Sequence, residues 1–500
     1  MIATIKLLSR ELTCLQKALI CVVSLTVIRL YADAFTSLEL YSDEAQYWTW
    51  AQDLDFGYFA NPPLIAWLVA ASTGVCGDSE SCVRILSPIL HAGTALALFW
   101  LGQTVANNRV AMWSAIIWIT LPYIGFSSLI FSNDVPLLFC WTLAVTFYRC
   151  LLNNRAWHFA IATGLSIGVG MLAKYHMIYI FLGIAIHLTL SSRDRWILFN
   201  LRGLVIIVLA LLILSPNIHW NLTNHFASIV HINDNANLNT GPSQKFQASN
   251  LLQCIVEQIA IFGPISFAAF AYQIILWARV KLSKEEQFLI SLSIPPLVII
   301  TVQACLFRVN ANWAVTTYPT ATVLVALWLV SSSKRYIRYL LIIPHLFISL
   351  TLAIMIANWP KVRISLTDRY FLRLSGWEQI AATSRLDILT NPDLPILMTD
   401  QMTMASLLYY MRDQLVVGKS KPGKRAVYIW DWNHHPDNHY ELIASYIPAT
   451  TNLMLILTNR KDISPILNSF EIKKDIRRIS ITRLGHTKKL GIWLVSKFKG

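Results

Sequence analysis

Long apolar stretches recur through the first 357 residues of this 500-residue chain and limit the folds that it can adopt. A helix needs about 20 mostly apolar residues to cross a bilayer, and inside lipid each backbone polar group must be paired within the protein. Segments of suitable length run over residues 14–35, 83–104, 110–127, 134–150, 158–173, 177–191, 201–217, 258–278, 287–306, 313–331 and 339–357. We therefore predict a polytopic α-helical membrane protein with about 11 transmembrane helices.

The charged residues agree with a membrane protein and argue against a nucleic-acid-binding one. Only 14% of the residues are charged, whereas a soluble domain carries about 25%. The formal net charge is +14, but the Lys and Arg residues of the first 357 positions punctuate apolar segments. Because the sequence also lacks a zinc-finger spacing or other nucleic-acid motif, no nucleic-acid partner is expected.

The distribution of Lys and Arg over the short loops predicts the orientation. With a cytoplasmic N-terminus, fifteen of these residues lie inside and five outside. One of the five, Arg29, lies within the first span, close enough to its outer end to snorkel. Basic residues before the first apolar run, and a small-residue pattern at 32–34, leave a cleaved signal peptide as the alternative to a retained first helix. Either outcome places the next loop outside.

The first outer loop is acidic, aromatic and free of cations. Residues 41–67 read "YSDEAQYWTWAQDLDFGYFANPPLIAW", and no Lys or Arg occurs between Tyr31 and Val83. Its apolar second half, residues 62–75, is too short to span a bilayer and predicts a helix lying along the interface. Cys76 and Cys82 follow, and an oxidising compartment would permit a disulfide between them. Two free thiols are the alternative.

A second domain is expected after the last span. An odd number of spans places residues 358–500 outside, apart from the transmembrane domain of residues 1–357. Apolar runs at 394–400, 426–432, 453–459 and 490–498 predict strands. They alternate with helical patterns at 376–386 and 403–413, so this is a small α/β domain. Residues 231–250 are polar and predict a long outer loop.

Polar residues that are costly in lipid gather at the predicted outer ends of the spans. They are Asp43, Glu44, Asn133, Asp134, Lys174, Tyr175, His176, His219, Trp220, Asn221, Arg308, Asn310, Asn312 and Trp313. Ionisable groups at membrane depth usually mark a functional path. Each residue alone has a structural interpretation: a solvated helix end for Asp43, an N-cap for Asp134, snorkelling for Lys174. Their location on one side favours a shared site.

This set of residues suits group transfer from a lipid-phosphate donor. Carboxylates at a low-dielectric surface tend toward raised pKa values, and can act as general bases or bind a metal. Lys174, His176, His219 and Arg308, with the amides of Asn310 and Asn312, offer donors to a phosphate or diphosphate. Because a phosphate leaves as a stable anion, no strong general acid is required.

Six motifs resemble the bacterial membrane glycosyltransferases of the protein-mannosyltransferase-like family, which has the class C fold. They are "DEAQYWTWAQDLDFGYFANPPLIAWL", "GDSESCVRILSPILHAG", "SNDVPLLFCW", "LAKYH", "HWN" and "ANWAVTTYP". The resemblance covers about residues 38–330 and is strongest to the aminoarabinose and galacturonic acid transferases that act on lipid A or lipopolysaccharide core.

The resemblance implies an inverting transferase that uses a polyprenyl-phosphate sugar at the periplasmic face of the bacterial inner membrane. The family's acidic pair carries over to Asp43 and Glu44, with Asp43 as the expected base or acceptor-orienting group, and its second acidic position to Asp134. The Lys of the "AKY" motif carries over to Lys174, which would contact the donor phosphate. Tyr58 and Asn61 of the first loop complete the expected substrate-binding set. The expected partners are this donor, a lipid or glycan acceptor and membrane lipids, and a monomer is expected.

One position departs from the family pattern. Related transferases have Lys before Pro62-Pro63, and the aminoarabinose enzymes have Glu-Lys, whereas this chain has Ala60-Asn61. The change removes an expected phosphate contact and an expected metal ligand, which weighs against aminoarabinose and against a bound divalent metal. A transporter or flippase, a protein O-glycosyltransferase and a non-catalytic scaffold are the alternatives. A transporter would place its charges near the midplane.

Overall fold

The computed structural model describes residues 12–235, 247–279, 282–307, 309–332, 336–359, 361, 372–390, 394–418, 421–431, 435–446, 453–460, 462–483 and 486–499. Its contacts divide the chain into two compact units. The helical unit comprises Met1–Phe35, Pro62–Ile65 and Arg84–Ala357, and the α/β unit comprises Thr36–Asn61, Ala66–Val83 and Asn358–Gly500. The first outer loop thus belongs mostly with the C-terminal domain, whereas the sequence assigned it to the transmembrane domain.

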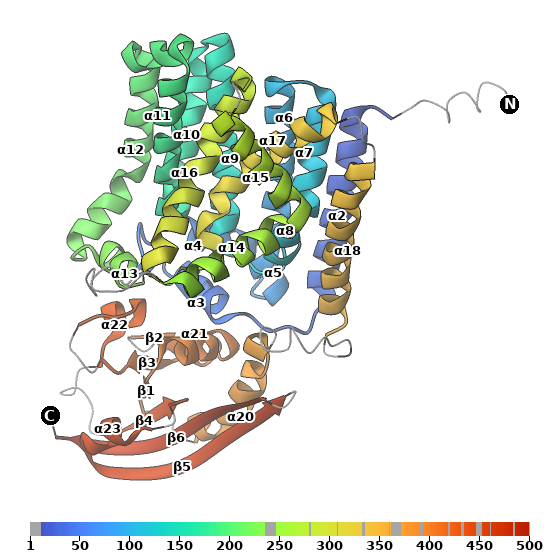
Figure 1. Cartoon of the computed structure of the whole chain (residues 1–500). Coiled ribbons are helices and arrows are strands. Elements are labelled where there is room, and N and C mark those ends of the chain that lie inside the picture. The colour runs from blue at the N-terminus through green and yellow to red at the C-terminus, as the bar shows by residue number, and fades with distance from the viewer. Residues whose placement is uncertain are drawn as a thin grey trace. The chain divides into compact units, whose positions relative to one another are not determined.

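The helical unit is a bundle of apolar helices (Figure 1). Its α-helices are α2 (Cys14–Phe35), α6 (Leu86–Val105), α7 (Asn108–Thr120), α8 (Pro122–Ser127), α9 (Asp134–Asn154), α10 (Trp157–Ala173), α11 (Tyr179–Leu190), α12 (Leu201–Thr223), α13 (Ala227–Asn235), α14 (Ala248–Phe262), α15 (Pro264–Arg279), α16 (Lys284–Leu306), α17 (Tyr318–Ser331) and α18 (Tyr336–Ala357). The 3-10 helices η1 (Tyr175–Ile178), η2 (Ser192–Phe199) and η4 (Ala311–Thr317) connect them, and α5 (Glu80–Arg84) leads into α6. Large buried side chains such as Trp118, Trp141 and Tyr148 fill the core.

The predicted class, a polytopic helical membrane protein, is confirmed. Within the described ranges, seven helices are long and apolar enough to cross a bilayer, or eight if one bent pair forms a single span. Three shorter apolar helices cover Leu64–Cys76, Trp157–Ala173 and Tyr175–Leu190. This count is lower than the predicted eleven because several segments are shortened by breaks. The segment at 110–127, for example, is divided into α7 and α8 before Pro122.

The span predicted at 258–278 contains a bend that the sequence analysis did not predict. Helices α14 and α15 meet at an angle of 111°. Gly263 lies between them with φ +79°, a backbone conformation that favours glycine. Pro264 cannot donate the backbone hydrogen bond that would continue α14, and it starts α15 instead. A Gly-Pro pair is a turn signal in a sequence. The prediction from the lengths of apolar runs did not take this signal into account.

Arg29 is also placed differently from the prediction. Its side chain is only 1% exposed, so it does not snorkel toward a membrane surface. Instead, Nη2 donates to the carbonyl oxygen of Ile119, at 2.7 Å, and to Oγ of Ser349, at 2.9 Å. Ile119 lies in the last turn of α7, where carbonyl groups lack partners within the helix. The guanidinium therefore joins α2 to α7 and α18.

The C-terminal part of the α/β unit is built on a six-stranded sheet of order β2-β3-β1-β4-β6-β5. The strands are β1 (Ile396–Met398), β2 (Leu415–Val417), β3 (Arg425–Ile429), β4 (Leu453–Thr458), β5 (Phe470–Arg483) and β6 (His486–Phe498). The first four in this order are parallel, and β6 pairs antiparallel with β4 and β5. The helices are α20 (Trp377–Leu389), α21 (Gln401–Tyr410), α22 (His439–Ala444) and α23 (Ser464–Asn468), with η5 (Leu372–Leu374) before α20.

The predicted α/β character of this region agrees with the sheet and its helices. The four predicted strands correspond to β1, β3, β4 and β6, and the two predicted helices to α20 and α21. The sequence did not predict β2, which has only three residues, or β5, whose polar residues suit the edge of a sheet. Most of the predicted loop at 231–250 lies outside the described residues.

The outer-loop part of this unit contains α3 (Ser42–Ala51) and α4 (Leu64–Cys76). Helix α4 corresponds to the helix predicted at 62–75. Cys76 and Cys82 form a disulfide, which confirms the first of the two alternatives.

We expect a membrane-permeant maleimide to label Cys76 and Cys82 only after reduction, because a disulfide sulfur offers no thiolate nucleophile. Peptide mass spectrometry of denatured protein, with and without reductant, measures this directly. Cys14, which is free, should react in both samples and serves as the control. Labelling of either loop cysteine without reductant would contradict the bridge.

Candidate active site

Asp134 is the centre of a polar cluster in the helical unit. It is the first residue of α9 and only 2% exposed. Its Oδ1 forms an ion pair with Nζ of Lys174, at 2.7 Å, and its Oδ2 accepts from Nδ2 of Asn312, at 2.5 Å. Tyr123 Oη donates more weakly to Oδ2, at 3.5 Å. Both carboxylate oxygens are thus occupied, and three residues distant in the sequence are held together.

Local breaks in the helices place these side chains. Helix α10 ends at Ala173, and Lys174 takes an extended conformation, with φ −161° and ψ 135°, before η1 begins. Asn312 lies in η4, between the end of α16 and the start of α17. The "LAKYH" and "ANWAVTTYP" motifs are therefore both short non-α segments between apolar helices. Such segments can direct polar side chains toward each other where a continuous helix could not.

A second polar group surrounds Tyr175. Its hydroxyl donates to Oδ1 of Asn217, at 2.7 Å, and accepts from Nδ2 of Asn221, at 3.1 Å. Asn217 and Asn221 are four residues apart on α12, so they share one face of this helix. Of these three, Tyr175 and Asn221 were among the polar residues expected at the outer ends of the spans, whereas Asn217 was not. Tyr175 lies inside the "AKYH" motif, and the i, i+4 spacing of two asparagines was the available signal for Asn217.

Some of the remaining predicted residues of this unit lie close to the cluster around Asp134 and others do not. The rings of His176 and Trp313 lie 6.1 Å apart, so these two segments also meet. His219 is exposed on α12, although its neighbour Trp220 is buried, and Asn310 is exposed at the start of η4. Arg308 lies outside the described residues. The structure thus brings together Asp134, Lys174 and Asn312, but not His219.

The α/β unit carries the acidic pair on α3, where the two carboxylates have different surroundings. Glu44 is fully buried, and its Oε2 accepts from the backbone N–H of Tyr41, at 2.9 Å, in a capping box. Asp43 is exposed. Adjacent residues of an α-helix point about 100° apart, so one carboxylate faces inward and the other outward. This geometry gives Glu44 a structural role and leaves Asp43 accessible.

The electrostatic environment of Asp43 favours a proton acceptor. Although the side chain is exposed, nearby protein displaces part of the water around its carboxyl. This desolvation, with repulsion from Glu44, raises the pKa of Asp43 to about 6, and the opposing effects of Ser42 and Arg373 are smaller. A carboxyl with such a pKa is mostly ionised at neutral pH and is a stronger base than an ordinary aspartate.

Tyr58 and Asn61, expected in the substrate-binding set, both make contacts within the first loop. Tyr58 is only 1% exposed and stacks on Trp50, with ring centroids 4.5 Å apart. Its hydroxyl donates to the Trp50 carbonyl oxygen and accepts from the Asp55 N–H. The ring is therefore part of the packed interior of this loop. Asn61 is half-buried, and its backbone pairs with that of Tyr58.

Among the described side chains, no three His, Cys, Asp or Glu residues lie together in a way that could hold a metal ion.

Comparisons with known proteins bear on the same regions. Residues 60–220 match the family model described as dolichyl-phosphate-mannose-protein mannosyltransferase. The lipid A galacturonosyltransferase RgtD of Rhizobium johnstonii is 33% identical over 323 residues, which are 63% of this chain and 65% of that protein. The match therefore spans somewhat less than two thirds of the relative.

The fold is similar to that of ArnT from Cupriavidus metallidurans. Its apo structure is 13% identical, with a TM-score of 0.65, and its structure bound to undecaprenyl phosphate is 11% identical, with a TM-score of 0.66. Each match covers 95% of this chain and 97% of the other. The polytopic bundle with a C-terminal α/β domain is thus the class C fold of membrane glycosyltransferases. The family-model match at residues 60–220 and the match to RgtD overlap the region of residues 38–330 that carries the motifs resembling the protein-mannosyltransferase-like family.

Proposed function

We propose that this protein is an inverting glycosyltransferase that moves a sugar from a polyprenyl-phosphate donor to lipid A or another envelope glycan at the periplasmic face. The exposed Asp43 carboxylate, with a pKa of about 6, is the observation that carries the proposal. Transfer of a sugar to a hydroxyl needs a base at that hydroxyl, and few groups match this requirement near neutral pH. The likeness to RgtD, a lipid A transferase by its name, supports the choice of acceptor.

In the proposed reaction, Asp43 accepts the proton of the acceptor hydroxyl as its oxygen attacks the anomeric carbon. The bond from that carbon to the phosphate oxygen breaks on the opposite side, and its electron pair leaves with the polyprenyl phosphate. The product is inverted at the anomeric carbon, and the proton resides on Asp43. One negative charge thus passes from the Asp43 carboxylate to the departing phosphate, so cationic groups near that phosphate lower the barrier.

Lys174 is the proposed cation for the phosphate. Its ammonium group has three N–H donors, and the contact with Asp134 uses one of them. Asp134 has both oxygens engaged by Lys174 and Asn312, so we assign it to positioning rather than to proton transfer. In this view, Asp134 orients a lysine and an amide toward the donor headgroup.

The proposed sugar is a hexuronic acid rather than an aminopentose. The likeness to a galacturonosyltransferase supports this choice, and Ala60-Asn61 replaces the Glu-Lys expected of an aminoarabinose enzyme. We expect mass spectrometry of lipid A and core oligosaccharide to show one hexuronic acid in cells with the gene and its loss in cells without it. Complementation by the wild-type gene should restore the sugar. Identical glycans in both strains would contradict the proposal, and an altered lipid distribution without a changed glycan would favour a transporter or flippase.

A further inference from the structure

The first outer loop is attached to the C-terminal domain through a buried carboxylate that the reaction does not use. Glu39, just before α3, is 4% exposed. Its Oε1 accepts from the backbone N–H of Gly376, at 2.7 Å, and its Oε2 from that of Trp377, at 2.5 Å. The Glu39 N–H also donates to the carbonyl oxygen of Leu374, at 2.9 Å. One residue therefore forms three hydrogen bonds to the segment that opens α20.

Glu39 acts as the cap of α20. The N-cap position is Gly376, which has no side chain to pair with the free N–H groups of the first turn. A carboxylate at this end is favoured by those donors and by the helix dipole. The cap comes from a residue 337 positions earlier in the chain, so α20 is completed only when residues 36–41 pack against it.

A second set of contacts connects α3 to α21. The Leu40 N–H donates to Oη of Tyr410, at 2.8 Å, and Nε2 of Gln401 donates to Oε1 of Gln46, at 2.8 Å. These contacts lie on both sides of Asp43 in the sequence. Farther along, the Trp50 ring packs edge-on against His439 of α22, with centroids 5.5 Å apart. Helix α3 is therefore held by contacts just before its first residue, in its first half and near its end.

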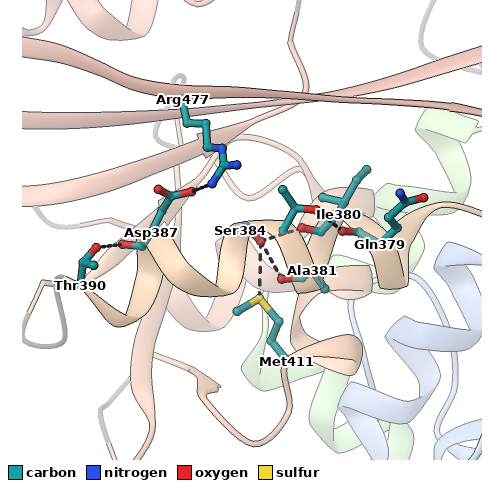
Figure 2. A network of polar contacts seen from close by, with 9 residues as sticks. Gln379, Ile380, Ala381, Ser384, Asp387, Thr390, Met411 and Arg477 are labelled. Atoms are coloured by element: carbon teal, nitrogen blue, oxygen red, sulfur yellow. Dashed lines mark hydrogen bonds and ion pairs between the residues drawn. The ribbon is translucent and has the colours of Figure 1, made fainter.

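The elements that hold α3 are themselves braced, as Figure 2 shows for α20. Asp387 of α20 forms an ion pair with Arg477 of β5, at 3.3 Å. Ser384, one turn earlier, contacts Sδ of Met411, at the end of α21, at 3.9 Å. The sheet, α20 and α21 are thus connected to one another. Glu39 and Tyr410 form the hydrogen bonds that hold the first loop against these two helices.

We infer that the C-terminal domain is a positioning element of the catalytic step: Glu39, Tyr410 and Gln401 hold α3 so that Asp43 is presented at its surface. This inference rests on the proposed role of Asp43. None of the three positioning residues needs to touch the substrate, so their loss should slow the reaction without weakening binding of the donor.

The test combines a kinetic measurement with a structural one. The double variant Glu39→Gln/Tyr410→Phe replaces an acceptor by an amide that cannot pair with both N–H groups, and removes the acceptor of the Leu40 N–H. We expect kcat to fall about ten-fold, since small misplacements of a reacting group can cost up to about 100-fold, with KM for the donor unchanged. Glu378→Gln is the matched control, because Glu378 is an exposed acid in the first turn of the same helix.

The structural measurement does not depend on catalysis. Ala45 is fully buried on α3, so an Ala45→Cys reporter should react slowly with a maleimide in the otherwise unaltered protein and several-fold faster in the double variant. Unchanged labelling would overturn the inference, whatever the activity, and faster labelling with unchanged kcat would overturn the link to catalysis. Full activity of an Asp43 variant would instead overturn the proposed function, while a change in labelling would still reveal the attachment.

Discussion

Asp43→Asn is expected to lower the rate of sugar transfer by roughly 10²- to 10⁴-fold, which is the usual contribution of a general base. The amide has nearly the shape of the carboxylate but cannot accept the proton of the acceptor hydroxyl at neutral pH. Because Asp43 is exposed and lies on the solvent side of α3, the substitution should leave expression and membrane insertion intact. Transfer of sugar from the lipid donor to purified acceptor, in detergent or proteoliposomes, measures the loss.

Asp53→Asn is the matched control, since Asp53 is an exposed acid two residues after the same helix. It should retain most of the activity. The pH profile gives an independent check: the wild-type rate should rise with pH through about 6, because the base must be ionised and the pKa of Asp43 is raised to about 6. Wild-type activity of the Asp43 variant would remove Asp43 from the mechanism.

Lys174→Met is expected to have the second largest effect, through both binding and stability. Loss of a cation from a phosphate site should raise the apparent KM for the lipid donor, by about 100-fold if the charge-assisted contact contributes about 3 kcal/mol. The Asp134 carboxylate, only 3% exposed, also loses its cationic partner. Breaking a buried ion pair in this way costs about 3–5 kcal/mol of folding free energy. Donor titrations and thermal unfolding in detergent separate the two effects.

The double variant Lys174→Met/Asp134→Asn distinguishes a donor-binding lysine from a structural one. It removes the buried charge together with its partner, and the amide oxygen introduced in place of the carboxylate would still accept from Asn312. We expect the unfolding temperature to recover toward that of the wild type while the KM for the donor stays high. Recovery of both quantities would mean that Lys174 only neutralises Asp134.

The sequence was most informative where one physical requirement dominates. Membrane-length apolar runs predicted the helical class, because lipid imposes both length and composition. The same count did not predict the bend within residues 258–278, because Gly263 and Pro264 interrupt the helix while the segment as a whole stays apolar. The sequence analysis also placed Arg29 wrongly. Hydropathy carries no information on whether a guanidinium has a carbonyl partner on another helix.

The candidate site was only partly predictable, for a similar reason. Motifs identified Asp134, Lys174 and Asn312, which the fold brings together. They could not tell which member of the Asp43-Glu44 pair faces inward, since that depends on the rotation of α3 about its axis. Glu39 carried no signal, because its partners are backbone N–H groups of Gly376 and Trp377, far away in the chain.

Glu39 caps a helix that begins more than 300 positions later in the chain. Residues 358–500 therefore depend on the first loop for part of their hydrogen bonding. Chimaeras that exchange only the part after the last span would pair α20 with a foreign loop and leave its first N–H groups unmatched. Exchanges between relatives should therefore carry residues 36–61 together with the tail.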